Sequence, residues 1–92
     1  FKVKKKVDGK FNKKEKEVLI GLKKVLEKNK FKNGKDLFDK FYEICEDSKI
    51  DNKDFFNVAY RAIIGKDKGP RLAEFILFVG QEKIAKLLGT LK

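Results

Sequence analysis

One short stretch, residues 65–72 (GKDKGPRL), concentrates the residue types that bind anions. It holds three cations, Lys66, Lys68 and Arg71, around a Gly-Pro pair that favours a turn followed by a helix. The first turn of a helix offers unpaired backbone N–H groups and the positive end of the helix dipole. Arg71 is unfavourable there unless an anion compensates its charge. That anion is either an acidic side chain of this chain, such as Glu74 or one from the acidic face of the second predicted helix, or a bound phosphate or carboxylate.

Side chains suited to catalysis or metal binding are scarce. The chain has no His, the commonest general base and metal ligand, and no phosphate-binding loop of the G-x-x-x-x-G-K-[ST] type. Its one cysteine, Cys45, excludes an internal disulfide and fits a reducing compartment. Because Cys45 stands among apolar residues, we expect it to be a buried hydrophobe rather than a nucleophile. We therefore expect no catalytic residue, metal site or cofactor within these 92 residues.

Basic charge is concentrated at the beginning of the chain. Residues 1–35 hold fourteen Lys and four acidic residues, a balance of +10, whereas residues 36–92 hold ten basic and ten acidic residues. Such asymmetry indicates a surface for an anionic partner, and nucleic acid is the leading candidate. A plain solvated face stays open as the alternative, because 22 of the 24 basic residues are Lys and A+T-rich coding produces the same bias.

The elements that must position these residues are predicted to be helices. Residues 1–11 contain too few apolar residues to fold alone and predict an extended basic arm with at most one short strand. From there on, apolar residues recur at intervals of three and four, as on one face of a helix. This periodicity predicts four helices and a short fifth one after Gly80, the four lying over residues 12–29, 33–47, 51–65 and 70–79.

Polar residues mark the predicted helix starts. Three helices begin with an N-cap residue and a polar partner three positions on: Asn12 with Glu15, Asn33 with Asp36, and Asp51 with Asp54. Pro70 suits the first position of the fourth helix, and Gly65 the end of the third. We expect Phe38 to face the core. Together these signals predict an all-α fold, a compact bundle of four to five short helices over residues 12–92 that follows the arm, 1–11.

The second half of the chain resembles a known family. Residues 59–88, AYRAIIGKDKGPRLAEFILFVGQEKIAKLL, look like the extreme C-terminus of class I lysyl-tRNA synthetases: a G-P-R-L turn, an apolar helix, a glycine stop and a final amphipathic helix. Residues 41–60, FYEICEDSKIDNKDFFNVAY, are similar to the preceding helix pair, so the resemblance covers roughly residues 37–90. Arg71 favours this family over the related glutamyl-tRNA synthetases, whose corresponding turn often lacks the Arg. The arm matches nothing in the pattern.

The resemblance implies an anticodon-binding domain of the helical cage type, whose partners are tRNA, lysine tRNA in particular, and the catalytic domain of its own protein. The full protein would be a cytoplasmic enzyme that attaches lysine to tRNA, with ATP and Mg²⁺ in that catalytic domain. Neither HIGH-like nor KMSKS-like signatures of such a domain occur here. The chain opens on Phe1 and shows no signal peptide, so we expect a cut inside a longer protein. No apolar run is long enough to span a bilayer, and we expect no membrane partner.

Recognition of an anticodon needs stacking surfaces and cations. Proteins hold unpaired bases on aromatic or Arg planes and neutralise phosphates with Lys and Arg. The candidate cations lie in two places, the turn after the third helix and the arm: Arg61, Lys66, Lys68 and Arg71, with Lys4, Lys5, Lys6 and Lys10. Tyr42 and Tyr60 are candidate stacking platforms, unless they pack in the core with hydrogen-bonded hydroxyls.

A second hypothesis is a docking module of a larger protein. The fourth helix is apolar nearly all round, and Leu77 and Phe78 fall off its main stripe. Exposure of these two side chains would favour docking against a neighbouring domain. A continuous positive face that joins the arm to the turn at Arg71 would favour RNA.

Overall fold

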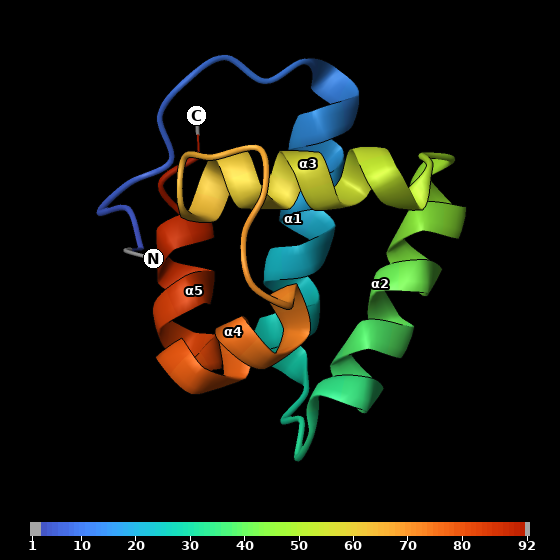
Figure 1. Ribbon diagram of the computed structural model, residues 1–92. Helices are drawn as coiled ribbons and strands as arrows, with labels where there is room; N and C mark the ends of the chain where they lie inside the picture. Colours follow the sequence, from blue (N-terminus) through green and yellow to red (C-terminus); the bar gives the residue numbers. More distant parts are fainter. Residues whose placement is uncertain (1–2, 92) are drawn as a thin grey trace.

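Five helices pack around a single core in the computed structural model, which describes residues 3–91 (Figure 1). They are α1 (Lys13–Lys28), α2 (Gly34–Ser48), α3 (Asn52–Ile63), α4 (Leu72–Val79) and α5 (Gln81–Leu88). The all-α class is thus confirmed, and residues 3–91 contain no strand. In Figure 1, α1 runs between α5 and α2, and α3 crosses over these three helices. No helix in the described range is both long and apolar enough to cross a membrane.

Side-chain capping explains where the first two helices begin. The Asn12 side chain accepts a hydrogen bond from the Glu15 N–H at 2.8 Å, and the Glu15 carboxylate accepts one from the Asn12 N–H at 2.9 Å, which completes a capping box. Asn33 caps α2 by accepting from the Asp36 N–H at 3.0 Å. The expected cap of α3 is wrong in its mechanism. Asp51 is the N-cap residue, but its side chain makes no capping hydrogen bond.

The connection from α3 to α4 begins with the expected glycine stop but differs from the expectation where α4 starts. Pro70 is not the first residue of α4; Arg71 is the N-cap, with non-helical backbone angles (φ −57°, ψ 115°), and the helix begins at Leu72. Pro70 instead accepts a hydrogen bond at its carbonyl from the Tyr60 hydroxyl, at 2.5 Å. A helix that began at Pro70 would turn this carbonyl along its own axis. At the other end α3 stops at Ile63, just before the left-handed Gly65 (φ 73°).

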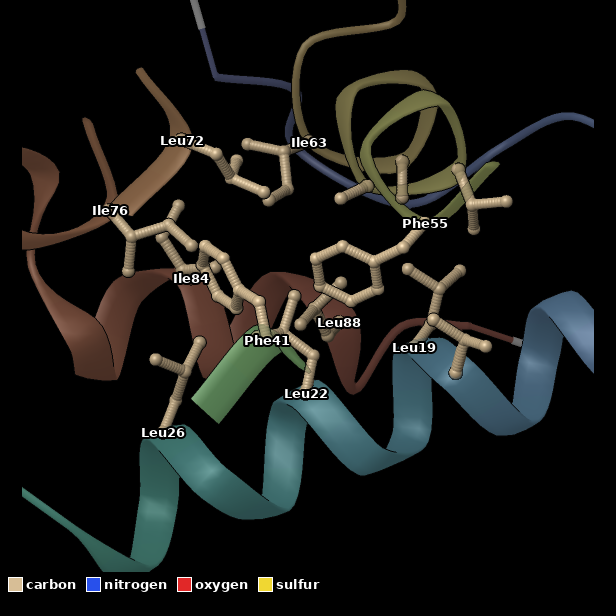
Figure 2. Close-up of a cluster of buried hydrophobic side chains, with 14 of the residues drawn as sticks. Leu19, Leu22, Leu26, Phe41, Phe55, Ile63, Leu72, Ile76, Ile84 and Leu88 are labelled. Atoms are coloured by element: carbon tan, nitrogen blue, oxygen red, sulfur yellow. The ribbon is translucent and has the colours of Figure 1, made fainter. Parts of the chain in front are cut away.

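All five helices contribute side chains to the core (Figure 2). Leu19, Leu22 and Leu26 of α1 lie on one face at helical spacing and meet residues of the other four helices, including Phe41, Phe55, Ile63, Ile76, Ile84 and Leu88. Cys45 is buried, as expected. Phe38 is not a core residue, contrary to the prediction, because it lies one position away from the buried stripe of α2 and remains 36% exposed.

The described part of the arm, residues 3–11, packs across the ends of the helices. The Lys4 N–H donates to the carbonyl of Ile63 at 2.8 Å, and the Val7 N–H donates to the Thr90 hydroxyl at 2.7 Å. The Val7 side chain is buried. The arm therefore connects the end of α3 to the residues that follow α5. Its first two residues lie outside the described range.

Candidate nucleic-acid interface

A pocket of about 540 Å³ opens between the start of α2, the middle of α3 and the start of α4. We call it the α2–α4 pocket, and its lining is formed by Gly34, Lys35, Phe38, Phe56, Tyr60, Arg71, Leu72, Ala73 and Glu74. Three aromatic rings and two cations thus surround one hollow. Single-stranded nucleic acids are bound by this combination, because every base has a face that stacks on a ring and every phosphate attracts a cation.

Aromatic rings form a continuous row along this side of the molecule. Phe38 meets Tyr42 edge-on with ring centroids 5.0 Å apart, and it stacks on Phe56 at 5.9 Å with an interplanar angle of 21°. Phe56 in turn stacks on Tyr60 at 6.4 Å and 29°. Phe38 and Tyr42 are 36% and 43% exposed. The row is therefore open to solvent at its α2 end and reaches into the pocket at its α3 end.

Phe38, Phe56 and Lys35 are site residues that the sequence analysis did not single out. The signal for Phe38 is present in the sequence: Phe38 and Tyr42 are four residues apart, and side chains at that spacing are neighbours on a helix surface. An aromatic pair displaced by one position from the buried Leu37 and its stripe indicates a second, outward stripe. Phe56 is half-buried and gives no comparable signal.

Tyr60 explains the Gly-Pro pair that precedes α4. Its half-buried hydroxyl donates to the Pro70 carbonyl, and burial raises the pKa of this hydroxyl above its ordinary value of 10.0, although the Leu72 backbone opposes the shift. A Cβ at Gly69 would come within 3.0 Å of the Tyr60 ring and 2.7 Å of the Ile64 side chain. A larger residue at position 69 would therefore require the Ile64 and Tyr60 side chains to shift. The Tyr60 hydroxyl is thus bonded internally, as one of the two alternatives expected, and its ring lines the pocket.

Arg71 stands at the rim of the pocket with its side chain 87% exposed. The ion pair with Glu74, one of the two predicted ways to compensate its charge, is present at 3.8 Å between Nη1 and Oε1. Both side chains are largely exposed, so the attraction is screened by water and contributes little. The guanidinium is thus accessible to a ligand in the pocket. Lys35 is also exposed at the start of α2.

Arg61, another predicted cation, is engaged inside the protein. Its Nη2 lies 2.5 Å from Oε2 of Glu15, and its Nε donates to Oδ1 of Asn57 at 2.9 Å. The guanidinium also lies over the Phe11 ring, 5.1 Å from the centroid, in a cation–π contact. These contacts attach the arm and the start of α1 to α3. Arg61 therefore holds the arm and the start of α1 in position against α3.

Lys4 is the predicted arm cation that lies beside the end of α3. The Lys4 side chain covers Gly65, where a Cβ would come within 3.2 Å of the Lys4 Cδ. The Lys4 ammonium also pairs with Asp8, and this hydrogen bond lowers the pKa of that carboxyl. Lys66 and Lys68 are exposed in the adjoining turn, as are three more cations on the arm, Lys5, Lys6 and Lys10. The structure therefore joins the arm to the turn, while Arg71 lies at the opposite end of the α3–α4 connection.

Acidic side chains occupy the outer face of α2. They are exposed and comprise Asp36, Asp39, Glu43, Glu46 and Asp47. Within residues 3–91, no three Cys or acidic side chains come together in an arrangement that could hold a metal ion. This face repels anions, whereas Arg71 and Lys35 present positive charge at the pocket.

The sequence of this chain is similar to those of known proteins. Residues 2–89 match the family described as "Anticodon binding domain". A lysine–tRNA ligase of Methanosphaera stadtmanae is 33% identical over 72 residues, which cover 78% of this chain and 14% of that protein. A lysine–tRNA ligase of Borrelia garinii is 35% identical over 72 residues, 78% of this chain and 13% of that protein. A third, from Thermoplasma acidophilum, is 38% identical over 50 residues, 54% of this chain and 10% of that protein.

The chain thus spans about one seventh or less of the length of these relatives. The family match, by contrast, takes in nearly the whole chain, from the arm to the end of α5. It includes every residue of the α2–α4 pocket. The chain belongs to the anticodon-binding domain family.

Proposed function

We propose that the α2–α4 pocket binds an unpaired base of a tRNA anticodon. The observation that carries this proposal is the row of aromatic rings that ends beside Arg71, in a chain whose family is defined by anticodon binding. Stacking of one base on an aromatic side chain contributes about 1–3 kcal/mol. Stacking alone does not tell bases apart, so the guanidinium of Arg71 and backbone groups at the pocket rim supply the hydrogen bonds that select the base.

The other predicted cations have separate roles in this proposal. Lys35 neutralises a phosphate next to the bound base, and Tyr42 extends the stacking surface outward. Contacts with phosphates further along the RNA come from the turn and the arm, through Lys66, Lys68, Lys4, Lys5, Lys6 and Lys10. Arg61 acts indirectly, because it holds the arm on the bundle through Glu15 and Phe11.

The full protein is proposed to be a class I lysyl-tRNA synthetase of the cytoplasm, with this chain as its C-terminal domain. A separate catalytic domain would attach lysine to the tRNA with ATP and Mg²⁺, while this domain holds the anticodon and contributes no catalytic residue. The support is that the three relatives described above are lysine–tRNA ligases at 33–38% identity. They favour lysine over glutamate as the amino acid.

Binding to tRNA tests the proposal. Fluorescence anisotropy of the chain with lysine tRNA, and with the same tRNA carrying a changed anticodon, is measured between 50 and 200 mM salt. We expect weaker binding to both as salt rises, because counterions compete for the phosphates, and a preference for the lysine anticodon that persists. Equal affinities that fall together would contradict anticodon recognition.

Phe78 supports a second, compatible function. It is 89% exposed on α4, whereas the neighbouring Leu77 is half-buried. We propose that this ring packs against another domain of the longer protein. Burial of a Phe side chain contributes about 1.5–3 kcal/mol, so Phe78→Ala should lower the free energy of unfolding by that amount in the full-length protein only. An equal change in the 92-residue chain would exclude docking at this position.

A further inference from the structure

A second and larger hollow, of about 870 Å³, lies where α1 ends beside α5. The last turns of α1, the connection to α2 and α5 from Gln81 to Lys86 form its walls, and Leu77 of α4 borders it. We call it the α1–α5 groove. Its charged residues are four cations and two acids: Lys23, Lys30, Lys32 and Lys86, with Glu27 and Glu82. None of them is among the residues that the sequence analysis singled out.

Positive charge is also concentrated beside this groove. Residues 23–35 hold six Lys and one acidic residue, so a balance of +5, half of the net charge of the chain, lies within thirteen positions. Lys23 is compensated by Glu27, with Nζ and Oε1 3.1 Å apart. Lys30 and Lys32 are exposed, and neither forms an ion pair with any residue in the described range 3–91. The lysines of this segment repel one another, and a bound polyanion relieves that repulsion.

A polar clip fixes the segment that carries these lysines. The Gln81 side chain, at the first position of α5, donates to the carbonyls of Leu26 and Asn29 at 3.1 and 2.6 Å, and it accepts from the Phe31 N–H at 3.0 Å. It thereby satisfies carbonyls left open at the end of α1. The α1–α2 connection is held against α5, so its lysines project from a fixed backbone.

The groove and the α2–α4 pocket lie on either side of this connection. Lys32 lines the groove, whereas Lys35, three residues on, lines the pocket. Helix α4 also borders both hollows, with Leu72 at the pocket and Leu77 at the groove. At 1.5 Å per residue, α4 is about 12 Å long. The pocket and the groove are therefore no further apart than a few nucleotides of a single strand.

We propose that the α1–α5 groove binds the phosphate backbone of the nucleotides next to the base held in the α2–α4 pocket. The inference rests on the proposed function and adds a second, sequence-independent contact to it. Flexible Lys side chains act as point charges for phosphate, while the apolar floor of Leu26, Phe31 and Leu77 accommodates sugars and base edges. Contacts with phosphates supply affinity and position the strand without reading its sequence.

Substitutions that remove positive charge test this inference. The double variant Lys30→Gln/Lys32→Gln is compared with Lys13→Gln/Lys14→Gln, which removes the same charge from exposed positions at the opposite end of α1. The dependence of the association constant on salt is measured for both variants and the unmodified chain, with lysine tRNA and its anticodon-changed form. Far-UV circular dichroism confirms that each variant is folded.

The groove variant should bind both tRNAs more weakly, and its log–log salt slope should be shallower by about 1.4, because each phosphate contact in a single strand contributes about 0.7. The anticodon preference should stay unchanged, as should the slope of the control variant. A groove variant with the unmodified slope, or a control that loses as much, would overturn the groove contact alone. An unmodified chain without anticodon preference would instead contradict the proposed function.

Discussion

The hydrogen bond from the Tyr60 hydroxyl to the Pro70 carbonyl determines how the chain enters α4. It holds Pro70 outside the helix and leaves Arg71 as the exposed N-cap residue at the pocket rim. Gly69 favours this approach because a Cβ there would crowd the Ile64 side chain and the Tyr60 ring. The position of the one Arg at the pocket therefore depends on a tyrosine ten residues earlier.

Removal of this hydroxyl should destabilise the protein. We expect Tyr60→Phe to lower the free energy of unfolding by about 1 kcal/mol, the net contribution of one hydrogen bond, as measured by urea denaturation. Tyr42→Phe is the matched control, because that ring is exposed on α2 and should lose less than about 0.5 kcal/mol. Equal losses in the two variants would show that the Tyr60 hydroxyl has no special role.

The same contact should make stability sensitive to alkaline pH. Because the pKa of Tyr60 is raised in the folded state, its contribution is complete below the ordinary value of 10.0 and is lost as pH rises through the folded-state value. The difference in stability between the unmodified chain and Tyr60→Phe should therefore shrink above pH 10. Urea denaturation at pH 8 and at pH 10.5 measures it, and a constant difference would contradict this account.

At the scale of helices, α1 and α3 both begin at residues that are favoured as N-caps, but the two caps differ in their expected contribution to stability. Asn12 belongs to a complete capping box, whereas Asp51 makes no capping bond through its side chain. We expect Asn12→Ala to lower the free energy of unfolding by about 1 kcal/mol and Asp51→Ala by less than about 0.5 kcal/mol. Thermal denaturation followed by circular dichroism measures both. A larger loss for Asp51→Ala would refute this assignment of the caps.

Helix periodicity was sufficient to predict most elements but not the aromatic row. Apolar intervals of three and four placed all five helices, since a buried stripe repeats with the helix turn. They also assigned Phe38 to the core, because an aromatic residue that flanks the stripe looks like part of it. The outward Phe38–Tyr42 pair has a local signal, but the stacking of Phe38 on Phe56 depends on where α3 meets α2, which is tertiary information. The delayed start of α4 has the same origin, in the hydrogen bond from Tyr60.

At the scale of the whole molecule, one basic segment, residues 30–35, borders both hollows. The sequence revealed that the first 35 residues carry the positive excess, but not that Lys35 lies at the aromatic pocket and Lys30 and Lys32 at the groove. It also placed emphasis on the arm, which the structure anchors at the end of α3 through Lys4 and beside the end of α5 through Val7. No local pattern in the sequence predicts that Gln81 lies beside Phe31, because the two residues are far apart along the chain.

The most direct test of the central claim, that the α2–α4 pocket reads the anticodon, is the affinity ratio between lysine tRNA and its anticodon-changed form for Arg71→Gln. Lys13→Gln, which loses one charge far from the pocket, is the control. We expect the ratio to fall toward one in Arg71→Gln, a loss of about 1–3 kcal/mol in discrimination by analogy with other Arg–base contacts, and to persist in Lys13→Gln. An unchanged ratio in Arg71→Gln would show that base recognition takes place elsewhere.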